Sequence, residues 1–501
     1  MGPIDGLMHG LSVACTYQNL LAAFIGAFAG TAIGVLPGLG PAAGIALIIP
    51  ITYSFPPATS LIMMAGMYYG AMYGGSTTAI LINMPGESAS VVTTIDGYKL
   101  TKKGRAGAVL FNVAIGSFVG GTVSVIGVML FAPPLAKFAL LFGPAEFFAM
   151  LMGGLLMFAK ISGNTLAAGF FPMAVGLILG TIGQEDVTGR VRFTFGFNDL
   201  SQGVELVALV VGLYGLAEIM SVIESLDEDV KLITVRVRDM LPTRTEWRRS
   251  LAPMARGTVL GFFFGLIPGP HSTLSSFASY RLEKAVSKYR DEIGQGAMEG
   301  AVGPETANNA AATAAMVPLL AFGVPFGAVV SLMLAAMMIY GVQPGPLLMT
   351  EHPEIFWGVI VSMYIGNVML LFINIPLIGV WVNFLRTPKY IFLPLILMLA
   401  IIGSYSVRNS MLDVYVLLLL GIFGYMMRKF NFELAPMVVA FVLGPMIEKH
   451  LREGLFLSQG NIAFFFSSPI AATMWIFVFI VMIMGFLRSR GAKKTAVGSD
   501  Q

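Results

Sequence analysis

The chain has 501 residues, of which 11% are charged and 56% hydrophobic, and its mean hydropathy is +0.81. Soluble proteins carry roughly 25% charged residues, so this composition cannot form a water-facing surface and predicts an all-α polytopic integral membrane protein. A net charge of +3 and a single cysteine, Cys15, exclude a nucleic-acid footprint, a disulfide framework and a cysteine metal cluster. The N-terminus lacks the basic region of a secretory signal, so we expect its first apolar stretch to be retained as a membrane segment.

The apolar stretches fall into two length classes. Those near or above the roughly 20 residues needed to span a bilayer are 16–35, 59–84, 106–132, 203–222, 355–380 and 468–487. The shorter ones are 42–54, 144–160, 164–182, 255–267, 300–321, 326–341, 390–405, 411–427 and 432–447. So many short stretches, interrupted by Gly and Pro, predict discontinuous or re-entrant helices, with about 11–14 transmembrane or re-entrant helices in all. Small-xxx-small spacing predicts close helix packing at Gly26, Gly30, Gly34, Gly66, Gly70, Gly74, Gly261 and Gly265.

The sequence contains an internal duplication. GVLPGLGP (34–41) recurs as GLIPGP (265–270), and PMAVGLILG (172–180) recurs as PMVVAFVLG (436–444). Between these pairs, AILINMPG (79–86) corresponds to LLAFGVPF (319–326). The order is preserved while the offset grows, as loop insertions into two copies of one unit require. Paired, Gly/Pro-interrupted short segments in both halves indicate where a transporter binds its substrate.

The few basic residues suggest that the two copies have opposite orientations, because Lys and Arg favour the cytoplasmic side in short loops. The loop after the first Pro85 motif carries Lys99, Lys102, Lys103 and Arg105, whereas its counterpart after Pro325 carries none. The bias is reversed earlier in each copy, where 52–58 has no basic residue but its counterpart has Arg281, Lys284, Lys288 and Arg290. We therefore predict two inverted repeats.

The predicted organisation is a first membrane repeat at 1–222, a cytoplasmic linker at 223–254, a second membrane repeat at 255–488 and a cytoplasmic tail at 489–501. Both copies end on basic segments, which simple inversion would place on opposite sides. The apolar stretch 390–405 has no full counterpart in the first copy. One extra crossing there places the C-terminus on the cytoplasmic side.

Gly/Pro-rich or polar clusters interrupt the apolar sequence at 37–41, 73–88, 268–273 and 303–309, the last leading to Gly323 and Pro325. Proline cannot continue a helix ladder and glycine exposes backbone, so each cluster is predicted to break a membrane helix. The free N–H groups at such a break suit a carboxylate, whereas carbonyl, Thr and Asn oxygens suit Na⁺. The alternative is that these clusters are packing kinks whose Ser and Thr hydroxyls bond back to their own helix.

The candidate substrate- or ion-binding residues are Pro37, Gly38, Ser76, Thr77, Thr78, Asn83, Pro85, Pro268, Gly269, His271, Glu305, Asn308, Asn309 and Pro325. A Na⁺ site is expected near Thr78, Asn83, Asn308 and Asn309. His271 either binds substrate or a proton, or is a structural residue at a helix start. No arginine lies in these clusters, so an anion must be met mainly by helix termini and bound cations. No catalytic residue and no cofactor is expected, apart from a coupling cation, Na⁺ or H⁺.

These motifs resemble the large membrane subunit of the tripartite tricarboxylate transporters of bacteria. The resemblance covers roughly residues 15–460. It is carried by GVLPGLGP, YGGSTTAILINMPGES, GPETANNAAA, FGVP and PMVVAFVLGPMIE with the following KHLREGL. It implies a multi-pass protein of the bacterial inner membrane that works with a small membrane subunit and a periplasmic substrate-binding protein. Uptake of a carboxylate such as citrate would be driven by a cation gradient. Eleven of the candidate residues, all except Pro268, Gly269 and His271, occupy family-motif positions.

Three other functions are alternatives to a secondary transporter. A passive anion channel or pore would need neither a delivering partner nor an ion gradient. An intramembrane enzyme would need a Ser/His pair, an Asp dyad or a metal set within the spans. The four scattered histidines, His9, His271, His352 and His450, argue against it. A purely structural role would leave the paired helix breaks unexplained.

Overall fold

Helices form almost the whole of the computed structural model, because a chain this apolar must satisfy its backbone hydrogen bonds within each segment. The structure describes residues 2–36, 38–163, 165–185, 188–224, 237–386 and 389–497. Its described part divides into two compact units. Unit 1 comprises residues 1–140, 206–267 and 271–426, and unit 2 comprises 141–205, 268–270 and 427–501. Each unit therefore takes segments from both halves of the chain, and the predicted repeat and linker boundaries stay a prediction.

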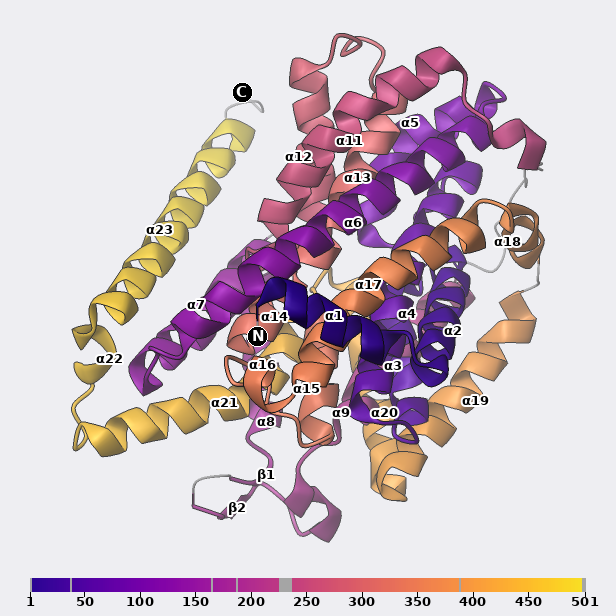
Figure 1. Cartoon of the computed structure of the whole chain (residues 1–501). Helices are drawn as coiled ribbons and strands as arrows, with labels where there is room; N and C mark the ends of the chain where they lie inside the picture. Colours follow the sequence, from indigo (N-terminus) through magenta and orange to yellow (C-terminus); the bar gives the residue numbers. More distant parts are fainter. Residues whose placement is uncertain are drawn as a thin grey trace. The chain divides into compact units, whose positions relative to one another are not determined.

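Unit 1 holds most of the described helices; Figure 1 labels the helices along the chain. Its first-half helices are α1 (Pro3–Ala14), α2 (Tyr17–Val35), α3 (Gly40–Thr52), α4 (Pro57–Ile82), α5 (Val91–Lys102), α6 (Ala106–Ala139), α9 (Leu206–Val210) and α10 (Ala217–Glu224). A 3₁₀ turn at Ser88–Ser90 precedes α5, and a π-helical segment, Val211–Leu216, joins α9 to α10.

The second-half helices of unit 1 follow a 3₁₀ turn at Val237–Met240. They are α11 (Arg244–Gly265), α12 (His271–Val286), α13 (Met298–Ala314), α14 (Met316–Phe322), α15 (Ala328–Ile339), α16 (Leu348–Glu351), α17 (Pro353–Asn374), α18 (Ile378–Phe384), α19 (Lys389–Arg408) and, up to Met426, α20 (Met411–Lys429).

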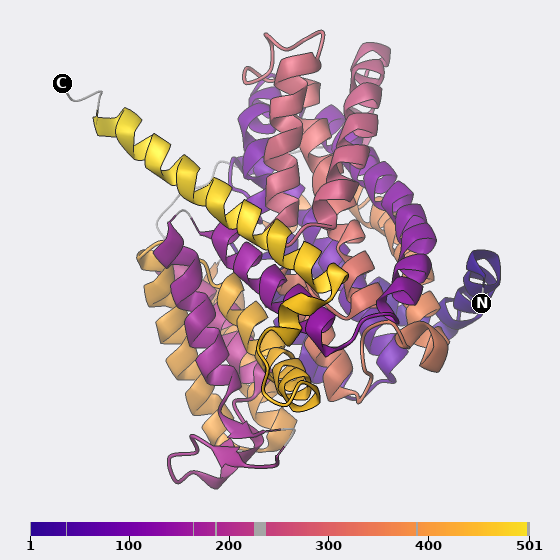
Figure 2. The ribbon, with the colours of Figure 1, turned by 90° about the vertical axis from the view of Figure 1, so that its left-hand side faces the viewer.

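Unit 2 is smaller. Its helices are α7 (Pro144–Ser162), α8 (Leu166–Gly180), α21 (Ala435–Leu457), α22 (Phe464–Ser467) and α23 (Pro469–Val497), with a 3₁₀ turn at Asn198–Gln202. The antiparallel strands β1 (Gly183–Gln184) and β2 (Val191–Arg192) pair Gly183 with Arg192. α21 packs on α7 and α8, and α23, yellow in Figure 2, packs on α7. α8 and α21 carry the duplicated PMAVGLILG and PMVVAFVLG sequences, so the duplicated segments are neighbours here.

The helices are long and apolar enough for a multi-pass membrane protein. The described helices that meet both conditions are Tyr17–Val35, Ala106–Ala139, Pro144–Ser162, Leu206–Glu224, Pro353–Asn374 and Met411–Lys429. The all-α polytopic class predicted from composition is therefore confirmed. Two of these helices, α7 and α20, were expected among the shorter stretches. Each continues for two residues beyond the predicted stretch, through Ser162 and Lys429, and so reaches 19 residues.

The glycines at four-residue spacing form the crossings of α2 with α4 and of α11 with α13. A Cβ on Gly30 would lie 2.3 Å from the Met67 carbonyl oxygen, and a Cβ on Gly70 would lie 2.3 Å from that of Ala27. In the second copy, a Cβ on Gly261 would lie 2.3 Å from the Ala307 carbonyl oxygen. Only glycine allows these backbones to approach so closely, and the predicted small-residue packing is confirmed at both crossings.

The two copies have the same order of helices: α2, α3, α4, α5 and α6 in the first correspond to α11, α12, α13–α14, α15 and α17 in the second. α4 ends at Asn83, with φ 59° and ψ 24°, and α14 ends at Gly323, with φ 69° and ψ 26°. Each of these left-handed caps precedes a proline by two residues, Pro85 and Pro325. The duplication thus preserves a helix break with the same backbone geometry.

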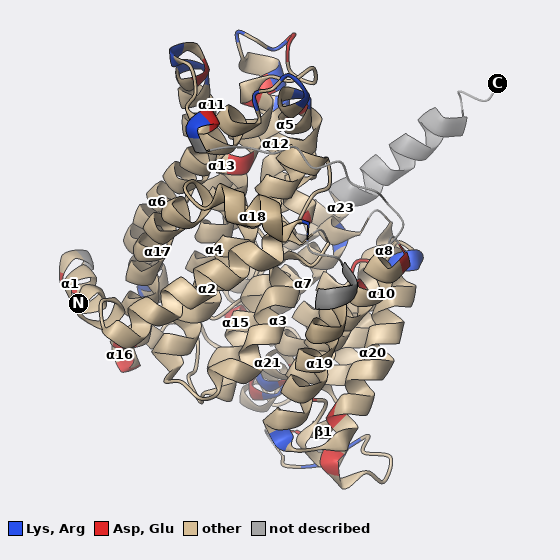
Figure 3. Ribbon diagram, turned by 90° about the vertical axis from the view of Figure 1, so that its right-hand side faces the viewer, with Lys and Arg blue, Asp and Glu red and all other residues tan. Residues whose placement is uncertain are grey.

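Corresponding loops lie at opposite ends of unit 1. At the end of α5, Lys99 Nζ donates to the Gly294 carbonyl (2.5 Å) and Lys103 Nζ to that of Gln295 (2.8 Å), in the loop after α12. Tyr340, after α15, donates through its hydroxyl to Thr52 Oγ1 at the end of α3 (2.7 Å). The loop after α5 thus meets the loop after α12, and the loop after α3 meets the loop after α15, as inverted copies require. Figure 3 shows Lys and Arg gathered where α11 begins and where α5 and α12 end.

One predicted helix break is wrong. The 303–309 cluster lies within α13, which runs without interruption from Met298 to Ala314 and contains Pro304. The helix continues through Pro304 although the proline removes the hydrogen bond that an N–H there would have donated to the carbonyl of Gly300. The break of this copy lies further along the chain, at Gly323. Likewise, residues 73–82 of the first-copy cluster are helical, and only the part after Ile82 is broken.

Candidate functional site: a cluster of helix breaks and buried carboxylates

The two breaks of the first copy are in direct contact. α2 ends at Val35, just before the first break, in the segment LPGLGP (36–41), and the second break begins after Ile82. A Cβ on Gly86 would lie 2.2 Å from the Gly34 carbonyl oxygen and 2.5 Å from Gly75 Cα, so only glycine fits between these backbones.

The two breaks of the second copy also meet. His271 is the first residue of α12 and is buried, and its Nε2 lies 3.3 Å from the Tyr68 hydroxyl of α4. A Cβ on Gly327, the residue before α15, would lie 2.5 Å from His271 Cε1. The His271 ring therefore fills the space between the start of α12 and the start of α15.

A hydroxyl pair joins the breaks of the two copies. Ser88, after the second break of the first copy, lies 2.9 Å through its Oγ from Thr273 Oγ1, at the start of α12. Both residues lie in the exposed part of this region. Helix starts from both copies thus converge on one place in unit 1.

Glu305 is the central side chain of the site and is fully buried. Ser76 of α4 donates to its Oε2 (2.7 Å), Thr93 of α5 donates to its Oε1 (2.5 Å), and Asn308 Nδ2 lies 3.4 Å from Oε2. α4 and α5 stand on either side of the first copy's second break. A single carboxylate of the second copy therefore connects the two sides of a break in the first copy.

A second carboxylate shares the same amide. Asn308 Nδ2 also donates to Glu87 Oε1 (2.9 Å), and Glu87 lies in the break itself and is half-buried. In the described part of the chain, no lysine or arginine forms an ion pair with Glu87 or Glu305. Two unit charges roughly 5 Å apart repel by about 3 kcal/mol at an effective dielectric constant of about 20. A cation or proton at this pair would relieve that repulsion.

The side chains of Asn309 and Thr78 form hydrogen bonds that fix helices, and they do not bond to the two carboxylates. Asn309 Nδ2 donates to Ser117 Oγ of α6 (2.8 Å) and to the Glu305 carbonyl oxygen (3.0 Å). Thr78 Oγ1 donates to the Gly75 carbonyl oxygen of its own helix (3.0 Å). These bonds fix α13 against α6 and restrain α4 next to the break.

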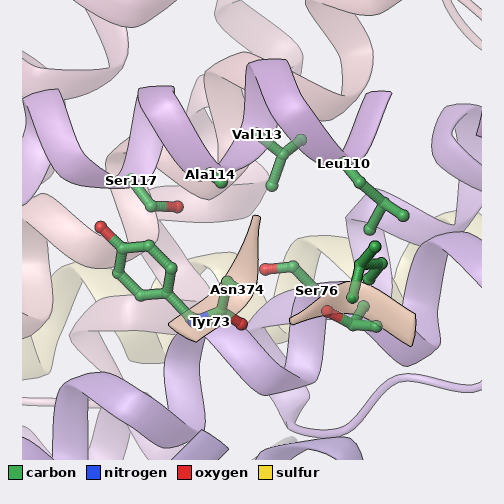
Figure 4. A pocket seen from close by; sticks show the side chains of 9 residues that line it. Tyr73, Ser76, Leu110, Val113, Ala114, Ser117 and Asn374 are labelled. Carbon is green, nitrogen blue, oxygen red and sulfur yellow. The ribbon is translucent and has the colours of Figure 1, made fainter. Parts of the chain in front are cut away.

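Thr77 and Ser76 line a small cavity among α4, α6, α17 and α18 (Figure 4). Its volume is about 10 Å³, which is room for one water molecule. The buried Tyr73 hydroxyl and Asn374 Oδ1 at its wall lack hydrogen-bond partners, so water is a suitable occupant. The lining residues are Tyr73, Ser76, Thr77, Leu110, Val113, Ala114, Ser117, Asn374 and Ile378.

The remaining predicted site residues shape backbone or lie apart from the carboxylates. Asn83 is exposed and caps α4, so its side chain does not join Thr78, Asn308 and Asn309 around one point. Gly38 has φ +90°, and Gly269, which follows Pro268 between α11 and α12, has φ +138°. Pro37 lies outside the described residues. The binding roles of these residues stay predictions.

Two residues at the site gave no signal in the sequence. Thr93 lies in a mixed polar and apolar segment, and only the packing of α5 on α13 turns it toward Glu305. Asp96 is one helical turn further along, is fully buried, and accepts from the backbone N–H groups of Gly294, Gly296 and Ala297 at 2.6–2.9 Å. It therefore holds the loop before α13 against α5.

Comparisons with known proteins identify the family of the chain. Residues 20–439 match the "Tripartite tricarboxylate transporter TctA family". An Agrobacterium vitis protein named "Uncharacterized 52.8 kDa protein in TAR-I ttuC' 3'region" is 44% identical over 497 residues, which cover 99% of each chain. A second protein of the same organism, "Uncharacterized protein in TAR-II ttuC' 3'region", is 43% identical over 237 residues, covering 47% of this chain and 98% of the relative. No solved structure matches the chain. The chain belongs to the tripartite tricarboxylate transporter TctA family, and is thus a multi-pass membrane protein and a large transporter subunit.

Proposed function

We propose that this chain is the permease subunit of a binding-protein-dependent secondary transporter. It imports tricarboxylates or related carboxylates, such as citrate, across the bacterial inner membrane by alternating access. Its partners are a small membrane subunit and a periplasmic substrate-binding protein, which delivers the substrate. No catalytic step is assigned to the chain. Its basic loops, 99–105 and 281–297, face the cytoplasm together with the C-terminus, since Lys and Arg in short loops favour that side.

The carboxylates of the substrate are bound by helix starts. α15 and α3 begin without a side-chain cap, so their first N–H groups are not bonded to a capping side chain. The start of α12 adds His271 and Thr273, which contact the first copy through Tyr68 and Ser88. The partial positive charge of a helix start can bind an anion without the help of a basic side chain.

The observation that carries the proposal is the pair Glu305 and Glu87 near the start of α12, with no basic partner among the described residues. An anionic substrate cannot bind next to two uncompensated carboxylates without a large electrostatic cost. A cation that enters with the substrate removes this cost. Binding of substrate and cation is therefore coupled, and uptake follows the cation gradient.

Uptake in cells tests this directly. Cells that express the chain with its two partners take up a labelled carboxylate, and an ionophore then collapses the Na⁺ and proton gradients while ATP is maintained and measured. We expect uptake to fall to the level of cells that lack the permease. Uptake that continues unchanged would contradict a secondary transporter. Uptake that needs no binding protein and only equilibrates the carboxylate would indicate the alternative, a passive pore.

A further inference from the structure

A buried glutamate lies against the first helix break of the first copy. Glu218 of α10 is only 5% exposed and lies within Leu206–Glu224, a segment apolar and long enough to span a membrane. A Cβ on Gly38, in the turn before α3, would lie 2.2 Å from Glu218 Oε1, so the carboxylate lies against the backbone of this turn. An acidic side chain within a membrane segment is costly, and such residues generally serve the function of the protein.

A π-helical segment sets the direction in which Glu218 points. The segment Val211–Leu216 interrupts the α-helical ladder directly before Ala217, and it packs against α3. A π-helical turn holds more residues than an α-helical turn, so it rotates the side chains that follow it around the helix axis. Such segments are rare and are frequently found at functional sites. The position of Glu218 at the break therefore depends on an uncommon element of the fold.

Apolar side chains on both sides of this contact hold α10 against the break. Ile219, the residue after Glu218, packs in one buried cluster with Leu36 and Leu39, which lie before and after Gly38. The glutamate is therefore fixed beside the break by its own neighbour in the chain.

The turn is open on another side. Gly38 is exposed, and nothing lies within 4 Å of a Cβ on Gly40. Both glycines have positive φ, +90° and +59°, and their lack of side chains allows a ligand to approach the backbone closely. A carboxylate of the protein thus lies at a turn that a carboxylate of the substrate can also reach.

We propose that Glu218 is an internal substitute for the substrate: its carboxylate occupies the start of α3 while the transporter is empty, and a carboxylate of the substrate displaces it. The inference deepens the proposed function, and it rests on that function for the substrate being a carboxylate. The partial positive charge of a helix start attracts either carboxylate, but two negative charges at one helix start repel each other. Glu218 therefore leaves the turn when the substrate binds, and its return promotes release of the substrate.

Carboxylate binding to the purified chain in detergent tests this proposal. The melting temperature is measured in increasing sodium citrate, against sodium chloride at the same ionic strength and pH. In the wild-type chain citrate must displace Glu218, so its apparent affinity is reduced to the fraction of molecules whose turn is free. We expect Glu218→Gln to reach half of its full stabilisation at a citrate concentration at least about threefold lower than the wild type. Equal concentrations, a weaker response of the variant or no response of either chain would overturn the proposal.

Glu218→Ala tests whether a carboxylate binds at this particular place. The substitution leaves a space that formate, a single carboxylate, can fill, so formate should raise the melting temperature of this variant more than that of the wild type. An equal response of both chains to formate would contradict the assignment. If Glu218→Ala fails to fold, Glu218→Gln in citrate decides alone.

The matched control is Glu146→Gln. Glu146 is another buried glutamate, whose Oε2 accepts from the Gly143 N–H at the start of its own helix, α7 (2.9 Å). The variant loses charge from a buried carboxylate but should keep the wild-type dependence on citrate and formate. A gain in citrate affinity in both Glu146→Gln and Glu218→Gln would show a general effect of charge, and would overturn the role of Glu218.

The two proposals can fail separately. If Glu218→Gln binds citrate more tightly than the wild type but uptake ignores the ion gradients, the role of Glu218 stands and the secondary transporter fails. If uptake follows the gradients but Glu218→Gln binds citrate no more tightly, the transport proposal stands and the role of Glu218 fails.

Discussion

Glu305 shows how one side chain can link the two copies of a duplicated protein. It lies on α13 of the second copy, and its partners Ser76 and Thr93 lie on either side of a break in the first. The neighbouring Asn308 bridges it to Glu87. Loss of any of these partners leaves a buried carboxylate with fewer donors, which costs about 1–3 kcal/mol per lost bond.

Substituting Ser76 or Asn308 with Ala should reduce carboxylate uptake at least several-fold while the protein remains in the membrane. Ser76→Ala removes a donor to Glu305, and Asn308→Ala removes the amide shared by two carboxylates. Uptake of labelled substrate is measured per amount of permease in isolated membranes. The matched control is Ser362→Ala, another buried serine, which bonds only within α17. Wild-type uptake in both variants would show that the site has been misplaced.

The sequence predicted several of these residues but not how they are arranged. Pro85 and Pro325 correctly indicated breaks, because proline acts on the backbone locally. Pro304 did not break α13, which continues through it with one backbone hydrogen bond fewer. The contacts of Glu305 with Ser76 and Thr93 join residues more than 200 positions apart in the chain. They depend on how α13 packs on α4 and α5, which no local pattern records.

Helix crossings hold the breaks in place. α2 crosses α4, and α11 crosses α13, through glycines whose missing side chains allow backbone contact. Since α4 carries Ser76 and α13 carries Glu305 and Asn308, these crossings fix, within each copy, the helix that contributes to the site. The small-xxx-small spacing in the sequence was sufficient to predict this packing, because the spacing itself defines one face of a helix.

Gly70→Ala should destabilise the protein by about 1–3 kcal/mol, because its Cβ would lie 2.3 Å from the Ala27 carbonyl oxygen and force α2 and α4 apart. Thermal unfolding in detergent measures this as a lower melting temperature. The matched control is Gly366→Ala in α17, where nothing lies within 4 Å of the added Cβ and no loss is expected. Equal melting temperatures for both variants would show that the α2–α4 crossing is not tightly packed.

Inverted copies give unit 1 its two distinct ends. The basic loops after α5 and α12 meet at one end, and the uncharged turns after α3 and α15 meet at the other. The sequence predicted this inversion from charge alone, because so few charges are present that each loop's content is unambiguous. It did not predict the two compact units, since contact between distant segments such as α8 and α21 follows from three-dimensional packing.

Side-specific labelling tests the inversion, on which alternating access depends. Single cysteines replace the exposed residues Lys102 and Lys288 at one end, and Ser54 and Gln343 at the other, in a Cys15→Ser background. Each is treated in intact cells with a membrane-impermeant maleimide, with permeabilised cells as the control. We predict that cysteines at 54 and 343 react from outside, and that those at 102 and 288 react only after permeabilisation. Labelling of 102 and 343 from one side, with 54 and 288 from the other, would contradict inverted copies and the alternating-access mechanism built on them.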